Sequence, residues 1–125
     1  MITIDNQVFN VGIISLKRKA DFLDSEATQR LEDGDMYRDL IGVFFNYDLK
    51  FEPCTAQNHS EYVRLWEKLT EPVEFHTVTV PYNNTTFSFV AYFSSVADEL
   101  MLQHNDKNFW KGLTVNFKAK SPAKR

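Results

Sequence analysis

Three runs of this chain place an apolar residue at every second position, and this pattern constrains the fold more than any other feature. A period of two puts these side chains on one face of a β-strand. They are Val43, Phe45, Tyr47, Leu49 and Phe51 in the first run, Phe87, Phe89, Ala91 and Phe93 in the second, and Leu113, Val115, Phe117 and Ala119 in the third. We therefore expect strands with one buried face and one solvent-exposed face.

Length and composition agree with a β-rich domain. The chain has 125 residues, among them 11 Phe, 5 Tyr and 2 Trp. This length favours a single domain over residues 1–125, with a core that needs neither metal nor disulfide. Aromatic side chains fit the pleated, half-buried surface of a sheet, so the composition favours sheet packing.

One segment has helical periodicity. Its apolar residues occur at i, i+3, i+4 and i+7, which places them on one face of a helix over residues 59–70. They are Tyr62, Leu65, Trp66 and Leu69. Asn58 and Glu61 have the spacing of a capping box, and Ser60 is an alternative N-cap. Pro72 ends the helix, and we expect the apolar face to pack on the sheet.

The other segments are assigned from alternation and from turn residues. Strands are expected over residues 8–20, 36–51, 73–80, 85–94 and 109–120. Residues 24–35 are polar and predict a long loop or a hairpin tip centred on Asp33-Gly34. Residues 95–108 are ambiguous between a short helical turn and irregular chain, and the last five residues are expected to be mobile. The predicted fold class is α+β: a mainly antiparallel β-sandwich or small barrel with one flanking helix.

Charge and cysteine content narrow the class of protein. The net charge is −3, from 17 acidic and 14 basic residues, which does not favour general attraction to nucleic acid or membranes. Cys54 is the single cysteine, so an internal disulfide is excluded. The N-terminus lacks the pattern of a secretory signal, and no apolar run is long enough to cross a bilayer. We expect no membrane partner.

Candidate catalytic and metal-binding residues form no recognisable set. The histidines His59, His76 and His104 have no second ligand at metal spacing, and Cys54 has no cysteine partner. A thiol nucleophile at Cys54 would need an adjacent base and an orienting group. The acids around Gly34 lack the ligand spacing of a calcium loop. We therefore predict no enzyme activity, no metal, no cofactor and no small-molecule substrate.

A basic and aromatic segment near the C-terminus suggests a third function. Phe109 and Trp110 precede the bases Lys111, Lys118, Lys120, Lys124 and Arg125, and such a set can bind single-stranded nucleic acid. The simpler interpretation is that Lys118 and Lys120 lie on the solvent face of the last strand, opposite Phe117 and Ala119. Nucleic acid is therefore not an expected partner.

Several stretches resemble small virion proteins encoded among the tail genes of phages and prophages of Gram-positive bacteria. They are ITIDNQVFNVGIISLKRKADFLD, DGDMYRDLIGVFFNYDLKF, SEYVRLWEKLTEPVEFHTVTVP, FSFVAYFSS and FWKGLTVNFKAKSPAKR. The resemblance implies a β-sandwich or small barrel with one helix, acting as a subunit of a tail tube, baseplate or tail-end complex. It also implies residence in the bacterial cytoplasm during assembly and then in the virion tail. The chain is short for a distal tail or baseplate hub protein.

The resemblance and the charge pattern together predict assembly. The acidic segment of one copy would contact the basic C-terminal strand of a neighbour, and such a heterologous contact forms rings or filaments. The proposed interface residues are Glu26, Arg30, Glu32, Asp33 and Asp35 on one side and Lys111, Lys118 and Lys120 on the other. The partners are then the protein itself and other tail proteins. The alternative is a small inhibitor encoded by a phage or mobile element, which binds a host protein through acidic residues 31–39.

Overall fold

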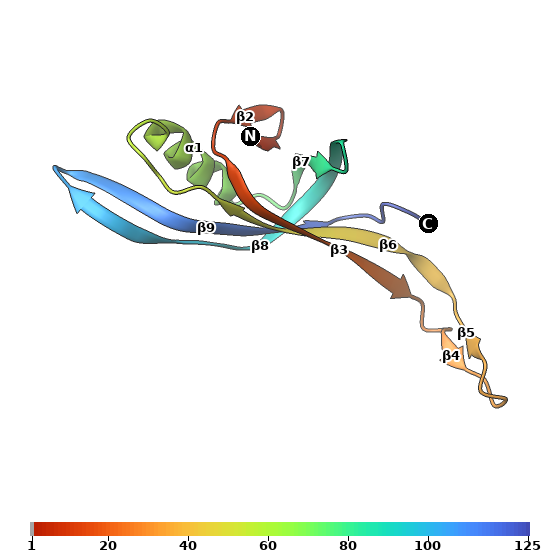
Figure 1. Cartoon of the computed structure of the whole chain (residues 1–125). Coiled ribbons are helices and arrows are strands. Elements are labelled where there is room, and N and C mark those ends of the chain that lie inside the picture. The colour runs from red at the N-terminus through yellow and green to blue at the C-terminus, as the bar shows by residue number, and fades with distance from the viewer. Residues whose placement is uncertain (1) are drawn as a thin grey trace.

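The computed structural model describes residues 2–125, which are mostly antiparallel β-structure with one short helix (Figure 1). The elements are β1 Ile2–Ile4, β2 Gln7–Phe9, β3 Ile13–Asp24, β4 Gln29–Arg30, β5 Met36–Tyr37, β6 Leu40–Phe51, α1 His59–Leu69, β7 His76–Tyr82, β8 Thr85–His104 and β9 Lys107–Ala119. Over this range, seven strands form one sheet in the order β2-β1-β7-β8-β9-β6-β3, and β4 pairs with β5. The predicted β-rich α+β class is confirmed.

The sheet is open, so the predicted small barrel is wrong. Strands β2 and β3 are its two ends, and the described residues form no pairing between them. The sheet nevertheless curls strongly. The Phe45 ring of β6 lies 5.9 Å from the Phe87 ring of β8, although β9 lies between these two strands in the sheet. This curl, rather than barrel closure, encloses the core.

The core lies at the centre of the sheet, where the alternation predicted it. Tyr47, Leu49 and Phe51 of β6 are buried, as are Leu113, Val115 and Phe117 of β9. The pattern weakens away from the centre: Val43 and Phe45 are only half-buried, and so are Phe87, Phe89 and Phe93 of β8 around buried Ala91. The buried face is therefore shorter than the strands that carry it.

Helix α1 covers this core and falls within the predicted range. Tyr62, Leu65 and Leu69 are buried, whereas Trp66 is half-buried at the edge of the core. Asn58 occupies the N-cap position, but the predicted capping box is not formed. Its side-chain oxygen accepts a hydrogen bond from the Thr55 amide at 2.6 Å, so it faces back into the preceding connection. Glu61 instead forms an ion pair with Arg64.

Two long hairpins leave the central body in opposite directions (Figure 1). We call residues 20–43, from the outer halves of β3 and β6 with β4 and β5 at the end, the first arm. Residues 97–112, from β8 and β9, are the second arm. Strand β8 runs without interruption to His104, so a helical turn within residues 95–108 is not formed. Asn105 and Asp106 both have positive φ, at 52° and 63°, and they form the turn at the end of the second arm.

The C-terminal residues are bound to the first arm and are not a free tail. The Val43 amide donates to the Lys124 carbonyl at 2.8 Å, and the Ala123 amide donates to the Val43 carbonyl at 2.8 Å. Gly42 permits this contact, because a Cβ at that position would lie 2.7 Å from Cβ of Pro122. The expectation of a mobile C-terminus was wrong because this contact joins residues about 80 positions apart.

Candidate functional site: the two arms and the body between them

The polar segment at residues 24–35 forms the end of the first arm, as the hairpin-tip prediction stated. The Leu31 amide donates to the Asp35 carbonyl at 2.6 Å, and the Gly34 amide donates to the Leu31 carbonyl at 2.9 Å. Gly34 has a φ of 93°, a conformation that favours glycine. The β4–β5 ribbon behind this turn consists of only two residue pairs, so the tip packs on little beyond itself.

The tip carries a strong negative charge. Residues 24–39 contain six acids and two bases, a net charge of −4. The predicted interface residues Glu26, Arg30, Glu32, Asp33 and Asp35 all lie here and are all exposed. Arg30 donates to the Gly34 carbonyl at 2.7 Å and so binds the turn. Within residues 2–125, the carboxylates of Glu32, Asp33 and Asp35 form no ion pair, so they face solvent or a partner.

The first arm also exposes large apolar side chains. They are Phe22, Leu23, Leu31, Met36, Tyr37, Leu40 and Ile41, each with more than 40% of its surface exposed. Sequence neighbours such as Phe22 and Leu23 lie on opposite faces of the ribbon, so both faces of the arm expose apolar side chains, and clusters of such residues often mark interaction sites. Nothing in the periodicity of the sequence separated these residues from core residues, because alternation identifies a face but not what covers it.

The predicted basic partner surface is dispersed. Lys111 lies on the second arm, 3.5 Å from the Glu99 carboxylate across the hairpin. Lys120 lies at the base of the sheet with its ammonium 4.7 Å from the centre of the Phe75 ring. Lys118 is exposed on β9 opposite Tyr92. The structure does not bring these three lysines together, and among the described residues none of them forms an ion pair with the acidic tip.

The aromatic residues considered for nucleic-acid stacking face helix α1. Trp110 lines a cavity of about 300 Å³ together with Tyr62, Val63, Trp66, Glu67 and Asp98. The Tyr62 hydroxyl donates to Asp98 at 3.0 Å, and burial raises the pKa of both groups. The Phe109 ring packs edge-on against His59, with 5.8 Å between ring centres. These rings therefore anchor the second arm to the helix.

A polar cluster that sequence reasoning missed lies beside the helix. Asp5, Glu71 and His76 bring one ligand atom each to within 4.8 Å of one another. The Lys68 ammonium lies 3.2 Å from Asp5 and 3.1 Å from Glu71. Nδ1 of buried His76 lies 2.6 Å from the Asp5 carboxylate. Since Lys68 forms ion pairs with both carboxylates, we interpret the cluster as a structural link between the N-terminal hairpin, the helix and β7.

This cluster predicts a loss of stability in acid. Burial would raise the pKa of Asp5, but hydrogen bonds from His76, the Thr77 amide and Lys68 together lower it from 3.8 to about 2. A carboxyl whose pKa is lower when folded contributes its full stability above about pH 4 and loses it as the pH falls towards 2. Asp5→Asn should cost about 1 kcal/mol at pH 7, a figure reduced for partial solvent exposure.

Urea denaturation across pH 2–7 measures this contribution. The stability difference between the wild type and Asp5→Asn should shrink as the pH falls below about 4. Glu74→Gln, at an exposed position, is the control and should differ little from wild type at any pH. A difference that stays constant from pH 7 to pH 2 would show that the charge of Asp5 is not what stabilises the cluster.

Cys54 lies in the segment between β6 and α1, but its side chain is part of the core and its thiol is not accessible to solvent. It is fully buried, and its amide donates to the Trp110 carbonyl at 2.8 Å. We expect a thiol reagent to leave the native protein unmodified and to react fully in guanidinium. Cys54→Ser should cost about 1–3 kcal/mol because it buries a hydroxyl, whereas Cys54→Ala should cost less. Rapid labelling of the native protein would contradict this burial.

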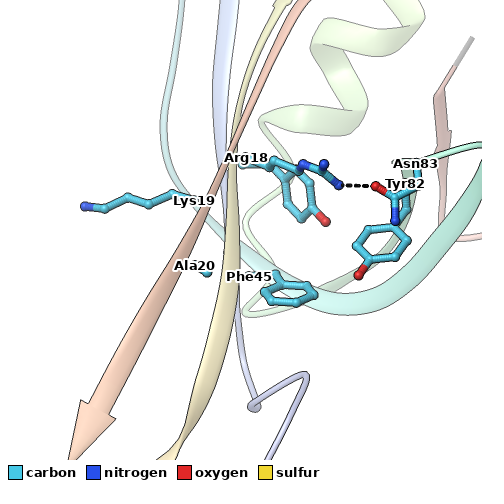
Figure 2. A pocket seen from close by; sticks show the side chains of 7 residues that line it. Arg18, Lys19, Ala20, Phe45, Tyr82 and Asn83 are labelled. Atoms are coloured by element: carbon cyan, nitrogen blue, oxygen red, sulfur yellow. Dashed lines mark hydrogen bonds between the residues drawn. The ribbon is translucent and has the colours of Figure 1, made fainter.

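A second cavity lies on the body, between the base of the first arm and the β7–β8 turn. Its volume is about 380 Å³, and it is lined by Arg18, Lys19, Ala20, Phe45, Tyr47, Tyr82 and Asn83. Arg18 of β3 points across it and donates to the Asn83 side chain at 2.9 Å, while Lys19 points away (Figure 2). The guanidinium also lies 5.6 Å from the centre of the Tyr82 ring. Sequence reasoning missed this site because its residues come from three separate segments.

The cavity contains an unsatisfied polar group. Tyr47 is 2% exposed, and its hydroxyl has no hydrogen-bond partner among the described residues. Burial raises the pKa of this phenol, so it stays protonated and can donate a hydrogen bond at neutral pH. Arg18 forms no ion pair with a described carboxylate. The site therefore offers two donors beside the stacked rings of Phe45 and Tyr82, and its described lining contains no acidic residue.

Comparison with known proteins leaves the family open. No protein-family model matches the chain, and no curated protein matches it. Among residues 2–125, no helix has the length and apolar character needed to span a bilayer.

Proposed function

We propose that this chain is a non-enzymatic structural subunit of a phage or prophage tail, which assembles with its own copies or docks with other tail proteins. The observation that carries the proposal is the pair of long hairpin arms, which extend away from a small core and expose apolar side chains (Figure 1). An arm with little packing of its own is stabilised when it lies on a neighbour. The sequence resemblance to tail-associated virion proteins is the reason for proposing a phage tail as the particle into which the chain assembles.

The shape and charge of the first arm support a contact between copies. Its apolar residues would be buried against a neighbour, and the carboxylates at its tip would select a basic surface. The arm and the body are different surfaces, so an arm-to-body contact is heterologous and leads to a ring or an open filament. The protein would then reside in the host cytoplasm during assembly and afterwards in the tail.

We also propose that the fold is the β-sandwich expected from the sequence. Phe45 of β6 contacts both Tyr82 and Phe87, with ring centres 6.0 Å and 5.9 Å apart. These contacts support a sheet whose two halves face each other across aromatic side chains. An experimental structure of the assembled protein would test whether the halves are two separate sheets.

Sedimentation velocity over a hundredfold range of concentration tests the proposal, combined with electron microscopy of negatively stained protein. We expect discrete ring-like oligomers or filaments that dissociate on dilution. A monomer at every concentration, which also fails to bind other tail proteins, would overturn the proposal. Such a result would favour the alternative, an inhibitor that binds a host protein through its acidic tip.

A further inference from the structure

We propose that the cavity lined by Arg18, Tyr47 and Tyr82 is the receptor for the first-arm tip of a second copy. This inference rests on the proposed function and specifies its contact. It replaces the lysine surface of the sequence-based hypothesis, whose three lysines are dispersed and partly engaged within their own chain.

The side chains of the cavity suit a ligand that carries a hydrogen-bond acceptor next to an apolar group. The buried Tyr47 hydroxyl is a donor without a partner, which is unfavourable until a partner arrives. Arg18 is exposed and donates one N–H group to Asn83, which leaves further N–H groups of its guanidinium for a ligand. Arginine also binds a carboxylate better than lysine does, because its two N–H groups can contact both oxygens. The Phe45 and Tyr82 rings stack on each other, with centres 6.0 Å apart, and form an apolar wall beside these donors (Figure 2).

The tip presents the complementary groups together. Leu31 is 44% exposed at the turn, and the carboxylates of Glu32 and Asp33 follow it directly in sequence. The backbone hydrogen bonds between Leu31, Gly34 and Asp35 hold this turn in shape before binding, which lowers the entropic cost of docking. In this arrangement Leu31 packs against the aromatic wall and a neighbouring carboxylate binds Arg18. The Tyr47 hydroxyl, which is buried in the free chain, donates to this carboxylate once the contact forms.

Charge around the cavity favours the same occupant. The Lys124 ammonium lies 6.0 Å from the centre of the Phe45 ring, so it adds a second cation near the mouth. The tip of the same chain does not reach this site, because extended strands at about 3.3 Å per residue carry it roughly 30–40 Å away. The contact therefore joins different copies.

Two charge-reversal variants of the full chain test the contact. Arg18→Glu removes the receptor but keeps the tip, and the double variant Glu32→Lys/Asp33→Lys removes the tip but keeps the receptor. We expect each variant alone to be monomeric by sedimentation. Mixed together, they should associate again, because the first variant keeps its tip and the second keeps its receptor. Lys17→Glu, on the opposite face of β3, is the matched control and should assemble like wild type.

Tyr47→Phe separates binding from folding. It keeps the ring and removes the unpaired hydroxyl, so its thermal midpoint should equal or exceed that of wild type while its dissociation constant for assembly rises about tenfold.

If the wild type assembles and both charge-reversal variants assemble equally well, the receptor assignment is wrong and the proposed function stands. Variants that are monomeric alone and remain monomeric when mixed would also overturn the assignment. If the wild type itself never assembles, the proposed function fails together with this inference.

Discussion

A variant that lacks the tip of the first arm is expected to fold normally and to lose self-assembly. Residues 26–38 can be replaced by Asn-Gly, because the Ser25 amide already donates to the Asp39 carbonyl at 2.8 Å and a two-residue turn closes such a pair. The removed segment contributes no side chain to the core. The thermal midpoint should therefore stay close to that of wild type.

The effect on assembly should be large, because this deletion removes both the exposed apolar residues of the tip and its carboxylates. We expect the dissociation constant between copies to rise about 100-fold or more, which corresponds to roughly 3 kcal/mol. Sedimentation velocity measures the constant, and circular dichroism measures the fold in the same samples.

A second variant separates charge from shape. Glu32→Gln, Asp33→Asn and Asp35→Asn together keep the outline of the tip and remove three charges. This variant should assemble more weakly than wild type and should respond less to added salt, since ionic screening then acts on fewer charges at the tip. If the shortened protein unfolds, the tip is part of the folding unit. If it folds and assembles as wild type does, the arm is not the contact.

The sequence was most informative where local pattern and burial coincide. Alternation identified the core face of β6 and β9, because Tyr47, Leu49 and Val115 lie where the sheet is covered on one side. Helical spacing identified α1 for the same reason. Asp33-Gly34 located a turn because glycine adopts positive φ at little cost.

The same patterns were uninformative on the arms. The sequence left residues 95–108 ambiguous between a helical turn and irregular chain, yet β8 continues to His104 because residues such as Leu100 pair with β9, here with Trp110. The pairing of β8 with β9 here outweighs the helical spacing of the apolar residues within the segment. Large apolar residues such as Phe22 and Met36 have the composition of a core strand, although the folded chain leaves them exposed.

Contacts between distant segments were beyond sequence reasoning. Arg18 and Tyr47 are cross-strand partners on β3 and β6, but Tyr82 joins them only because the sheet curls, and curl depends on the whole set of strand pairings. The cluster of Asp5, Lys68 and His76 likewise joins a turn, a helix and a strand. In each case the residue types were visible, but their proximity was not.

The largest expected effect on folding is at Leu65, in the middle of helix α1. This side chain is fully buried between the helix and the sheet, beside Tyr62 and Leu69 on the same helix face. Leu65→Ala removes buried methyl groups and leaves a cavity, which costs about 2–5 kcal/mol. That is a large share of a typical unfolding free energy of about 5–15 kcal/mol.

Urea denaturation of Leu65→Ala, compared with Val63→Ala, measures this cost. Val63 lies on the same helix with 41% of its surface exposed, so its truncation should change stability by less than about 1 kcal/mol. Trp66→Ala should fall between the two, because Trp66 is half-buried beside Trp110. Equal effects at Leu65 and Val63 would mean that the helix does not pack through the face that contains Leu65. Since the arms project from the body that this helix covers, Leu65→Ala should also weaken assembly, but only under conditions in which the body itself unfolds.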